Sequence, residues 1–308
     1  MTYSLPSPPS RPQSLLGQFL QFVRRPHYTV NLPTPHSGRV DIPRLYALAL
    51  LIVLPLGFIS AIVATNLQTN NAIEEVVQTV GIEQIVLLVV VFAPLFEEAI
   101  FRLPLRYTPS NLVIPLGIGL LGVVSALMRS QVLPEVASLP CLGGIIALVW
   151  LLRVWLQRQD SKPIHQLYEK WIGWLFYGLA ILFGLIHLGN FSSLGWQNWF
   201  LAPLLVLPQT ALGVFLGFIR LRYGFWWAVL THAIHNALAL TPLLLVRLGS
   251  EKLLNSLEQG ETEALQDLAP TDYMLLLLLM AFVVGILMLC IVTVWFLIGA
   301  WLKERRQP

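Results

Sequence analysis

The chain carries eight apolar blocks of membrane-spanning length, and this pattern limits its possible folds more than any other feature. About twenty apolar residues suffice for a helix to cross the hydrocarbon core of a bilayer. Backbone groups inside a bilayer must be hydrogen-bonded internally, so we expect every block to be a helix. The sequence therefore predicts an all-α, polytopic transmembrane bundle of about eight spans. The blocks lie near residues 43–65, 82–103, 111–128, 139–156, 171–191, 198–219, 224–246 and 273–301.

Composition supports a membrane protein and argues against nucleic acid as a partner. The 308 residues are 56% hydrophobic and only 11% charged, whereas soluble domains are roughly a quarter charged. The net charge is +3, but no long Lys/Arg run accompanies it. The two cysteines, Cys141 and Cys290, both fall inside predicted spans and are poor candidates for a disulfide.

The chain divides into a polar N-terminal segment and one integral membrane domain. Residues 1–40 are rich in proline and serine, and we expect a largely disordered tail there. Within this tail, the stretch "SLLGQFLQFVRR" is amphipathic and is predicted to lie on the membrane surface. Residues 41–303 form the predicted membrane domain. The sequence contains no fixed-period repeat.

The connections between blocks alternate in charge, which predicts the orientation of the chain. Basic residues gather in the N-terminal segment, the second, fourth and sixth connections, and the C-terminus. The first and seventh connections are acidic overall, and the fifth has no charge. Lys and Arg concentrate in cytoplasmic loops. We therefore predict eight spans with both termini cytoplasmic.

Three charged residues interrupt the second block in the stretch "FEEAIFR", residues 96–102. Charges at membrane depth are costly and usually have a function or a partner. Glu98 and Arg102 are four residues apart on one helix face, in the order that favours an ion pair. Glu97 points about 100° away and has no such partner. Glu97 therefore has either a function or a structural role, in which it pairs with Arg102 or Arg106 or extends toward the membrane surface.

Two later blocks also carry polar side chains. His187 ends the stretch "FGLIH", with Phe183 one turn before it on the same face. His232 and Asn236 share one face in "THAIHNAL", and His235 lies to one side of it. Each group also has a purely structural explanation. His187 could be a packing residue, and His232 and Asn236 could form hydrogen bonds between helices.

Taken together, a carboxylate, two imidazoles and an amide on three helices supply the groups that hydrolysis needs. Glu97 can remove a proton from water, and His187 can orient or share that proton. His232 and Asn236 can donate hydrogen bonds to the oxyanion that develops on a carbonyl. Other groupings of the polar residues leave more of them unexplained.

These motifs resemble the CPBP family of intramembrane endopeptidases (CAAX proteases and bacteriocin-processing enzymes, also called the Abi or Rce1-like family). Its pattern of EExxxR, FxxxH and HxxxN corresponds to "EEAIFR", "FGLIH" and "HAIHN" in this chain, within about 82–246. The resemblance implies a catalytic cavity that faces the cytoplasm. It implies Glu97 as the residue that activates water, assisted by His187, with His232 and Asn236 at the oxyanion. Glu98, Arg102, Phe183 and His235 would be supporting residues.

The resemblance also implies a membrane protein or peptide as substrate. No cofactor is expected, because the sequence lacks the HExxH spacing of zinc proteases; the alternative is a zinc site with Glu97, His187 and His232 as ligands. A transporter and a non-catalytic scaffold are the other classes left open. One inconsistency concerns depth. Counted along the helices, His187 lies nearer the opposite side of the bilayer than Glu97 and His232 do. Either the predicted start of the fifth block is several residues too early, which we favour, or this helix is tilted or broken near Gly184 or Gly189.

Overall fold

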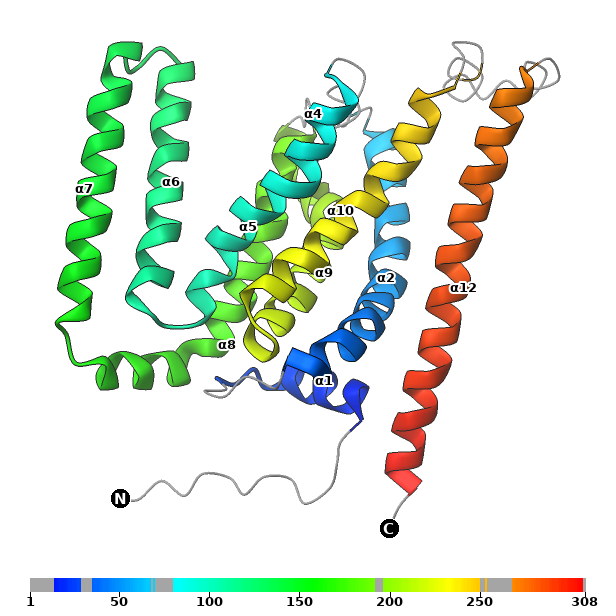
Figure 1. The fold of residues 1–308 in the computed structure, drawn as a ribbon, viewed down its shortest axis with the longest axis horizontal. Helices are drawn as coiled ribbons and strands as arrows, with labels where there is room; N and C mark the ends of the chain where they lie inside the picture. The colour runs from blue at the N-terminus through cyan, green and yellow to red at the C-terminus, as the bar shows by residue number, and fades with distance from the viewer. Residues whose placement is uncertain are drawn as a thin grey trace.

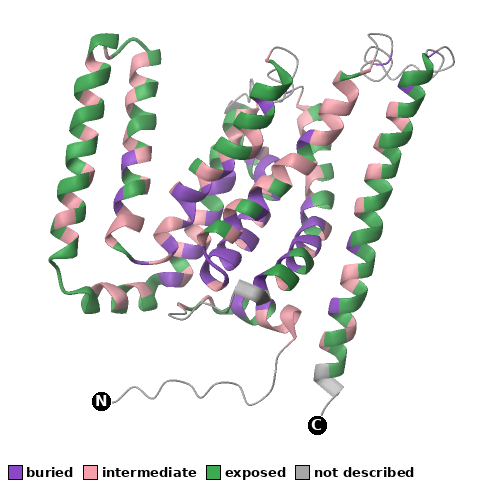
Figure 2. Cartoon of the chain, in the orientation of Figure 1, coloured by how far each residue is buried: buried purple, intermediate pink, exposed green. Residues whose placement is uncertain are grey.

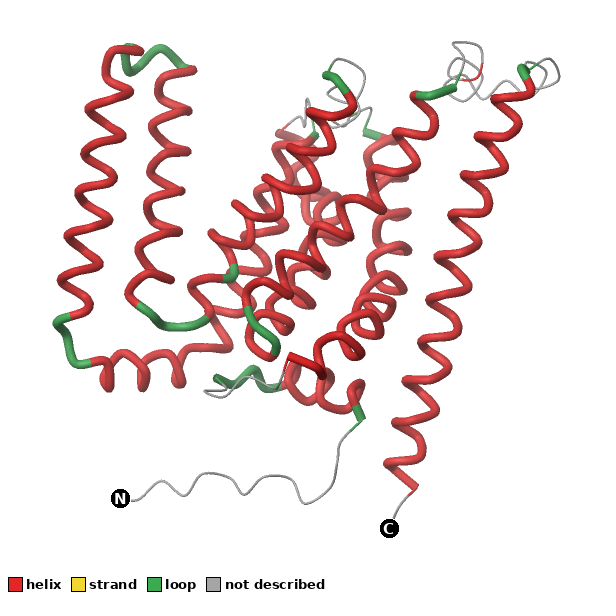
Figure 3. Tube along the Cα trace, viewed as in Figure 1, coloured by secondary structure: helices red, strands yellow, loops and turns green. Residues whose placement is uncertain are grey.

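The computed structural model describes residues 14–28, 35–67, 69, 80–191, 196–249, 253 and 268–306. All elements in these ranges are helical (Figure 3). The α-helices are α1 (Leu15–Arg24), α2 (Pro35–Asn66), α4 (Ile82–Val86), α5 (Ala93–Phe101), α6 (Pro109–Arg129), α7 (Ser138–Gln157), α8 (Ser161–Ile186), α9 (Ala202–Arg222), α10 (Phe225–Arg247) and α12 (Pro270–Arg306). The π-helical turn η1 (Leu87–Phe92) joins α4 to α5, and short 3-10 turns are η2 (Leu103–Leu105), η3 (Glu135–Ala137), η4 (His187–Asn190) and η5 (Trp196–Leu201).

The eight predicted spans are confirmed. Eight helices in the described residues are long and apolar enough to cross a membrane, and each one coincides with one of the predicted blocks to within a few residues at its ends or extends beyond it. The third and fourth blocks, which are short and rich in glycine and proline, correspond to α6 and α7. The chain is therefore an integral, multi-pass membrane protein with an all-α fold.

Five spans form a central group, and three others stand at its sides (Figure 1). The α6–α7 hairpin lies on one flank and α12 on the other, while α2, the α4–α5 span, α8, α9 and α10 lie between them. Helix α9 occupies the centre: 61% of its apolar window is buried, compared with at most 28% in any other span. Figure 2 accordingly shows the buried residues gathered in the middle of the bundle, while the flanking helices expose the apolar surface that a bilayer would cover.

Close packing of α9 against α8 depends on two glycines. A Cβ atom on Gly217 would lie 2.7 Å from the ring of Phe176, and one on Gly213 would lie 3.2 Å from the carbonyl oxygen of Ala180. The Phe176 ring is buried and also packs against Phe22 with ring centroids 5.2 Å apart, so it has little room to move. Glycine at these positions lets the two backbones approach.

Helix α1 differs from its prediction. It was expected on the membrane surface, within a disordered tail, but it packs into the protein core. Phe19 stacks on Phe215 with ring centroids 4.5 Å apart, and Phe22 contacts Phe218 edge to face at 5.2 Å or less. The Tyr177 hydroxyl donates to the Val23 carbonyl oxygen. The amphipathic pattern was identified correctly, but the apolar face meets protein rather than lipid. Residues 1–13 and 29–34 of the predicted tail lie outside the described residues.

We expect Gly217→Val to destabilise the bundle by about 1–3 kcal/mol, because the added atoms overpack a rigid contact. Gly178→Val in α8 is the matched control, since a Cβ atom there meets nothing within 4 Å. Thermal unfolding of the two variants in detergent compares them directly. Equal losses of stability in both would contradict this role for Gly217.

Candidate active site

Glu98 is the buried glutamate of α5, and its carboxylate contacts Arg102 of the same span and His232 of α10. Its Oε2 lies 3.4 Å from Nε of Arg102, at exposed fractions of 0% and 1%, which confirms the predicted pairing four residues apart. Its Oε1 accepts a hydrogen bond of 3.0 Å from Nδ1 of His232 on α10. The sequence did not predict this second contact, which links the two motifs.

Arg102 is held by charge and by an aromatic ring more than by hydrogen bonds. None of its side-chain nitrogens has a hydrogen-bond partner in the described residues. Its guanidinium carbon lies 4.4 Å from the ring centroid of Phe183, a favourable cation–π distance. Phe183 also packs edge to face against His187 and His232, at centroid distances of 4.8 and 5.5 Å. The phenylalanine of the second motif is thus the contact shared by Arg102 and both histidines.

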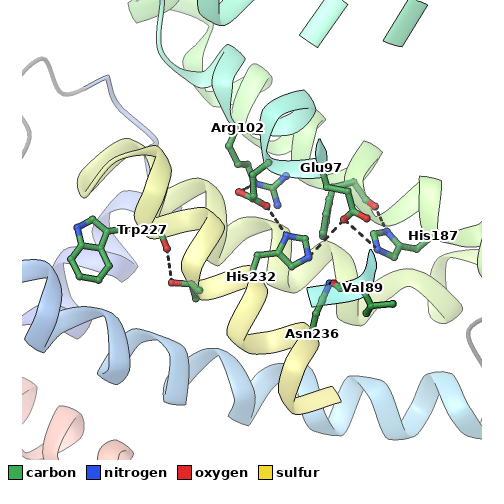
Figure 4. A network of polar contacts seen from close by, with 10 residues as sticks. Val89, Glu97, Arg102, His187, Trp227, His232 and Asn236 are labelled. Atoms are coloured by element: carbon green, nitrogen blue, oxygen red, sulfur yellow. Dashed lines mark hydrogen bonds and ion pairs between the residues drawn. The ribbon is translucent and has the colours of Figure 1, made fainter. Parts of the chain in front are cut away.

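Glu97 faces the other way, toward the rings of His187 and His232 (Figure 4), and it lines a cavity between the helices. Its side chain is 23% exposed, and Oε2 lies 3.8 Å from Nε2 of His187 and 3.7 Å from Nε2 of His232. These distances are too long for direct hydrogen bonds. They are short enough for one water molecule to bond to the carboxylate and to a ring nitrogen. Three motifs that are far apart in the sequence therefore meet at one carboxylate oxygen.

The hydrogen bonds made by Nδ1 of His187 and His232 determine whether Nε2 of each ring, which faces Glu97, carries a hydrogen. Nδ1 of His187 lies 2.7 Å from the carbonyl oxygen of Phe183, which can only accept, so Nδ1 carries the hydrogen. Nδ1 of His232 donates to the Glu98 carboxylate for the same reason. In the neutral rings both Nε2 atoms are therefore acceptors directed at the Glu97 side of the site.

Asn236 lines the cavity beside the site and also makes a hydrogen bond to the backbone of η1. Its Nδ2 donates to the carbonyl oxygen of Val89 at 2.9 Å. Val89 lies in η1, where Ala93 N–H bonds to the carbonyl five residues earlier, that of Leu88. In that register the next donor would come from Pro94, which has no N–H. Asn236 thus satisfies a carbonyl that the helix leaves free, and the second N–H of its amide is not used in this contact.

A cavity of about 560 Å³ contains this site. Its walls come from η1 and α5, the end of α8 with η4, α9, and α10. The lining residues are mostly apolar, with the polar exceptions Glu97, His187, Asn190, Gln209, His232, His235 and Asn236.

Two of the polar residues in this cavity, Asn190 and Gln209, were not identified from the sequence. The Oε1 atom of Gln209 is buried and has no hydrogen-bond partner in the described residues. A polar pair, Gln209 and Thr210, inside an apolar block was the available signal. His235, predicted as a supporting residue, turns its Nδ1 to the hydroxyl of Tyr46 on α2 at 3.2 Å.

The depth of His187 has a different explanation from the one expected. Helix α8 begins at Ser161, before the predicted start at 171, so an early boundary is not the cause. Figure 1 shows instead that the first turns of α8 run across one end of the bundle before the helix turns along it, and that α4, α5 and α10 are tilted. The α-helix ends at Ile186 and continues as η4, which places His187 beside Glu97.

The lining of the cavity extends from Glu97 toward one end of the bundle. From Glu97 and His232 the lining continues along α10 to Leu243 and along η4 to Phe191. Helix α1 and the first turn of α10 lie at the opposite end, where Trp227 packs against the α1 cluster. The lining of the cavity therefore extends from Glu97 away from the end of the bundle at which α1 lies.

Removing either Glu98 or Arg102 should destabilise the protein by about 3–5 kcal/mol, because the partner is left as an unpaired buried charge. The double variant Glu98→Ala/Arg102→Ala should lose less than the sum of the single losses. Unfolding in detergent measures all three, with the exposed Glu135→Ala as control. Additive losses would show that the ion pair does not couple the residues.

Comparison with known proteins shows to which protein family the chain belongs. A family model described as type II CAAX prenyl endopeptidase Rce1-like matches residues 81–238, which is slightly more than half of the chain. The matched segment contains Glu97, His187, His232 and Asn236 together with their neighbours in the cavity. No curated protein and no solved structure matches the chain. The chain belongs to the Rce1-like family of type II CAAX prenyl endopeptidases and is, in general terms, an intramembrane endopeptidase of the CAAX type.

Proposed function

We propose that the protein hydrolyses a peptide bond of a membrane-associated protein or peptide, with a water molecule activated by Glu97. The observation that carries this proposal is the convergence of the Glu97 carboxylate with Nε2 of two histidines, at 3.8 and 3.7 Å. A carboxylate and imidazole acceptors around a space for one water form a general-base site. The cavity of about 560 Å³ beside them has room for a peptide segment.

In the first step the water donates one hydrogen to Glu97 and the other to Nε2 of His187. The hydrogen bond between Nδ1 of His187 and the Phe183 carbonyl holds the ring in the tautomer that accepts at Nε2. Glu97 takes the proton as the water oxygen bonds to the carbonyl carbon of the substrate. His187 thereby orients the water and shares its charge, while Glu97 is the base.

The carbonyl oxygen becomes an oxyanion, which needs hydrogen-bond donors. Asn236 offers the N–H of its amide that is not bonded to Val89. His232 offers Nε2–H when the ring is doubly protonated, and the Glu98 carboxylate at 3.0 Å from Nδ1 balances that charge. The peptide C–N bond then breaks, and the amine takes the proton from Glu97. The products are a carboxylic acid and an amine, which exchange the remaining water proton to become a carboxylate and an ammonium group, and the base is regenerated.

The other cavity residues suit an apolar peptide with an ordinary backbone. Leu212, Leu240, Leu243 and Phe191 provide apolar walls. The unpartnered Oε1 of Gln209 offers an acceptor to a backbone N–H of the substrate.

Zinc is the alternative cofactor. The donor types, one carboxylate and two imidazole Nε2 atoms, would suit it. Their spacing does not, since no group of three or more His, Cys, Asp or Glu side chains in the described ranges is arranged to hold a metal ion. The Asn236 amide also favours the metal-free reaction, because its N–H is an oxyanion donor whereas its oxygen would be a weak zinc ligand. We propose the metal-free mechanism.

Transport and scaffolding are less well supported. Each would leave unexplained why a carboxylate, two oriented histidines and an amide meet in one cavity. The orientation we propose has both termini in the cytoplasm, on the basis of the Lys/Arg bias. Substrate and lipid bilayer are the only partners that the site and the apolar surface call for.

Glu97→Gln should lower turnover by about 10²- to 10⁴-fold while the protein stays folded, because the amide cannot accept the proton of water. Glu83→Gln, an exposed residue of α4, is the matched control and should keep its activity. Cleavage of a membrane peptide by the purified proteins measures both. Turnover of Glu97→Gln close to that of the parent would exclude Glu97 as the base.

Activity should survive a strong chelator, and the purified protein should contain no stoichiometric zinc. The reason is that the proposed reaction uses Glu97 and the histidines as acid–base and hydrogen-bonding groups. Peptide cleavage with and without chelator, together with elemental analysis, measures this. Activity that is lost on chelation and restored by zinc, but not by magnesium, would make His187 and His232 metal ligands.

A further inference from the structure

We propose that His235 donates a hydrogen bond from Nε2 to the carbonyl oxygen at which the substrate is hydrolysed, and that the hydroxyl of Tyr46 holds the ring in the tautomer that can do so. This inference rests on the proposed hydrolytic function of the cavity and assigns it a further residue. His235 lines the same cavity as Glu97, but activation of water by Glu97 does not itself use it.

The contact between Tyr46 and His235 determines which nitrogen of the His235 ring carries the hydrogen. The Tyr46 hydroxyl lies 3.2 Å from Nδ1 of His235, its one hydrogen-bond partner in the described residues. The Tyr46 side chain is buried together with Leu50 and Cys290. If Nδ1 carried the hydrogen, the hydroxyl would accept it and its own hydrogen would be left without an acceptor, which is costly for a buried group. The hydroxyl therefore donates to Nδ1, and Nε2 carries the hydrogen.

The second nitrogen of the His235 ring is directed away from Tyr46, because the two nitrogens of an imidazole form their hydrogen bonds in widely different directions. Nε2 has no hydrogen-bond partner in the part of the chain that the structure describes, and neighbouring atoms do not close it off as they do Oε1 of Gln209. His235 lines the cavity. Its Nε2–H is therefore available to a molecule bound there.

The three histidines of the cavity divide into two acceptors and one donor. Nδ1 of His187 bonds to the Phe183 carbonyl and Nδ1 of His232 to the Glu98 carboxylate, so Nε2 of each neutral ring has no hydrogen. His235 has the opposite arrangement. A water molecule that loses a proton needs acceptors, whereas a carbonyl oxygen that gains negative charge needs donors. His187 and His232 thus suit the water, and His235 suits the carbonyl.

The position of His235 on α10 places it beside the other candidate donors. It directly precedes Asn236 and follows His232 by three residues, a spacing that brings Cβ atoms to about 5–6 Å from each other on a helix. Asn236 has one N–H to offer, since Nδ2 also bonds to Val89. His232 can donate from Nε2 only when its ring is doubly protonated. His235 supplies a second donor that needs no charged ring.

¹⁵N NMR of the histidine-labelled protein in detergent tests the tautomers without any need for turnover. At alkaline pH, where the rings are neutral, we expect hydrogen on Nε2 of His235 and on Nδ1 of His187 and His232. The His235 signals are identified by their loss in His235→Asn. Tyr46→Phe keeps the aromatic ring but removes the hydroxyl, so the His235 hydrogen should then be distributed over both nitrogens.

Hydrogen on Nδ1 of His235 in the parent protein would overturn the proposal. Unchanged His235 signals in Tyr46→Phe would overturn the role of Tyr46. Both results are independent of hydrolysis. If Glu97→Gln keeps its activity, the assignment of the base fails while the tautomers stand, so the two failures are distinguishable.

Two substitutions separate the donor from the contact with Tyr46. His235→Asn keeps an acceptor near the position of Nδ1 but has no donor in the cavity, whereas His235→Gln places an amide N–H near the position of Nε2. We expect kcat for cleavage of a membrane peptide to fall about 10²- to 10³-fold in His235→Asn with little change in KM. His235→Gln should regain part of this loss.

The matched control is His27→Asn, an exposed histidine outside the cavity, which should keep its activity. Thermal unfolding in detergent verifies that all variants are folded. A kcat of His235→Asn close to that of the parent would overturn the proposal, because the contact with Tyr46 alone would then suffice. A His235→Gln variant no more active than His235→Asn would also contradict it.

Discussion

The rest of the site depends on the two interactions of the buried Glu98 carboxylate. This carboxylate is shared between Arg102, 3.4 Å away on the same helix, and His232, 3.0 Å away on α10. A buried charge is tolerated only when it is paired and hydrogen-bonded. Meeting that requirement fixes the ring of His232, and it brings the Arg102 guanidinium over Phe183, the ring against which both histidines pack. Glu97, its neighbour in sequence, then faces the cavity, where its carboxylate lies 3.8 and 3.7 Å from Nε2 of His187 and His232.

Irregular backbone, rather than regular helix, completes the arrangement. The π-helical turn before α5 and the proline that follows it leave the Val89 carbonyl without a helical partner, and Asn236 supplies the missing donor. The change from α-helix to 3-10 turn at His187 lets that side chain bond to the Phe183 carbonyl and still reach Glu97. Gly184 permits the close contact behind it, since a Cβ atom there would lie 2.0 Å from Oγ1 of Thr210. Irregular helical turns of this kind are frequent at functional sites.

Local patterns in the sequence predicted the features that depend on spacing along one helix. The eight spans follow from block length, and the pairing of Glu98 with Arg102 follows from the helical repeat. Contacts between helices were beyond such reasoning, and these include the Glu98–His232 hydrogen bond, the use of Asn236 by Val89, and Gln209 in the cavity wall. The amphipathic pattern of α1 was visible, but a sequence alone does not say whether an apolar face meets lipid or protein. The roles of Glu97, His187, His232 and Asn236 in the reaction remain predictions.

Single-turnover hydrolysis in water enriched in ¹⁸O tests most directly whether Glu97 activates water. An activated water transfers its oxygen straight to the substrate, so the new carboxylate of the product should carry one ¹⁸O atom and the peptide containing Glu97 should carry none. Mass spectrometry of the product and of the digested enzyme measures both. If Glu97 instead attacked the peptide carbonyl itself, a mixed anhydride would form with loss of the amine, and attack of water on the Glu97 carbon of that anhydride would leave ¹⁸O in the enzyme carboxylate and an enzyme oxygen in the product. Recovery of ¹⁸O in the Glu97 peptide after one turnover would contradict the account.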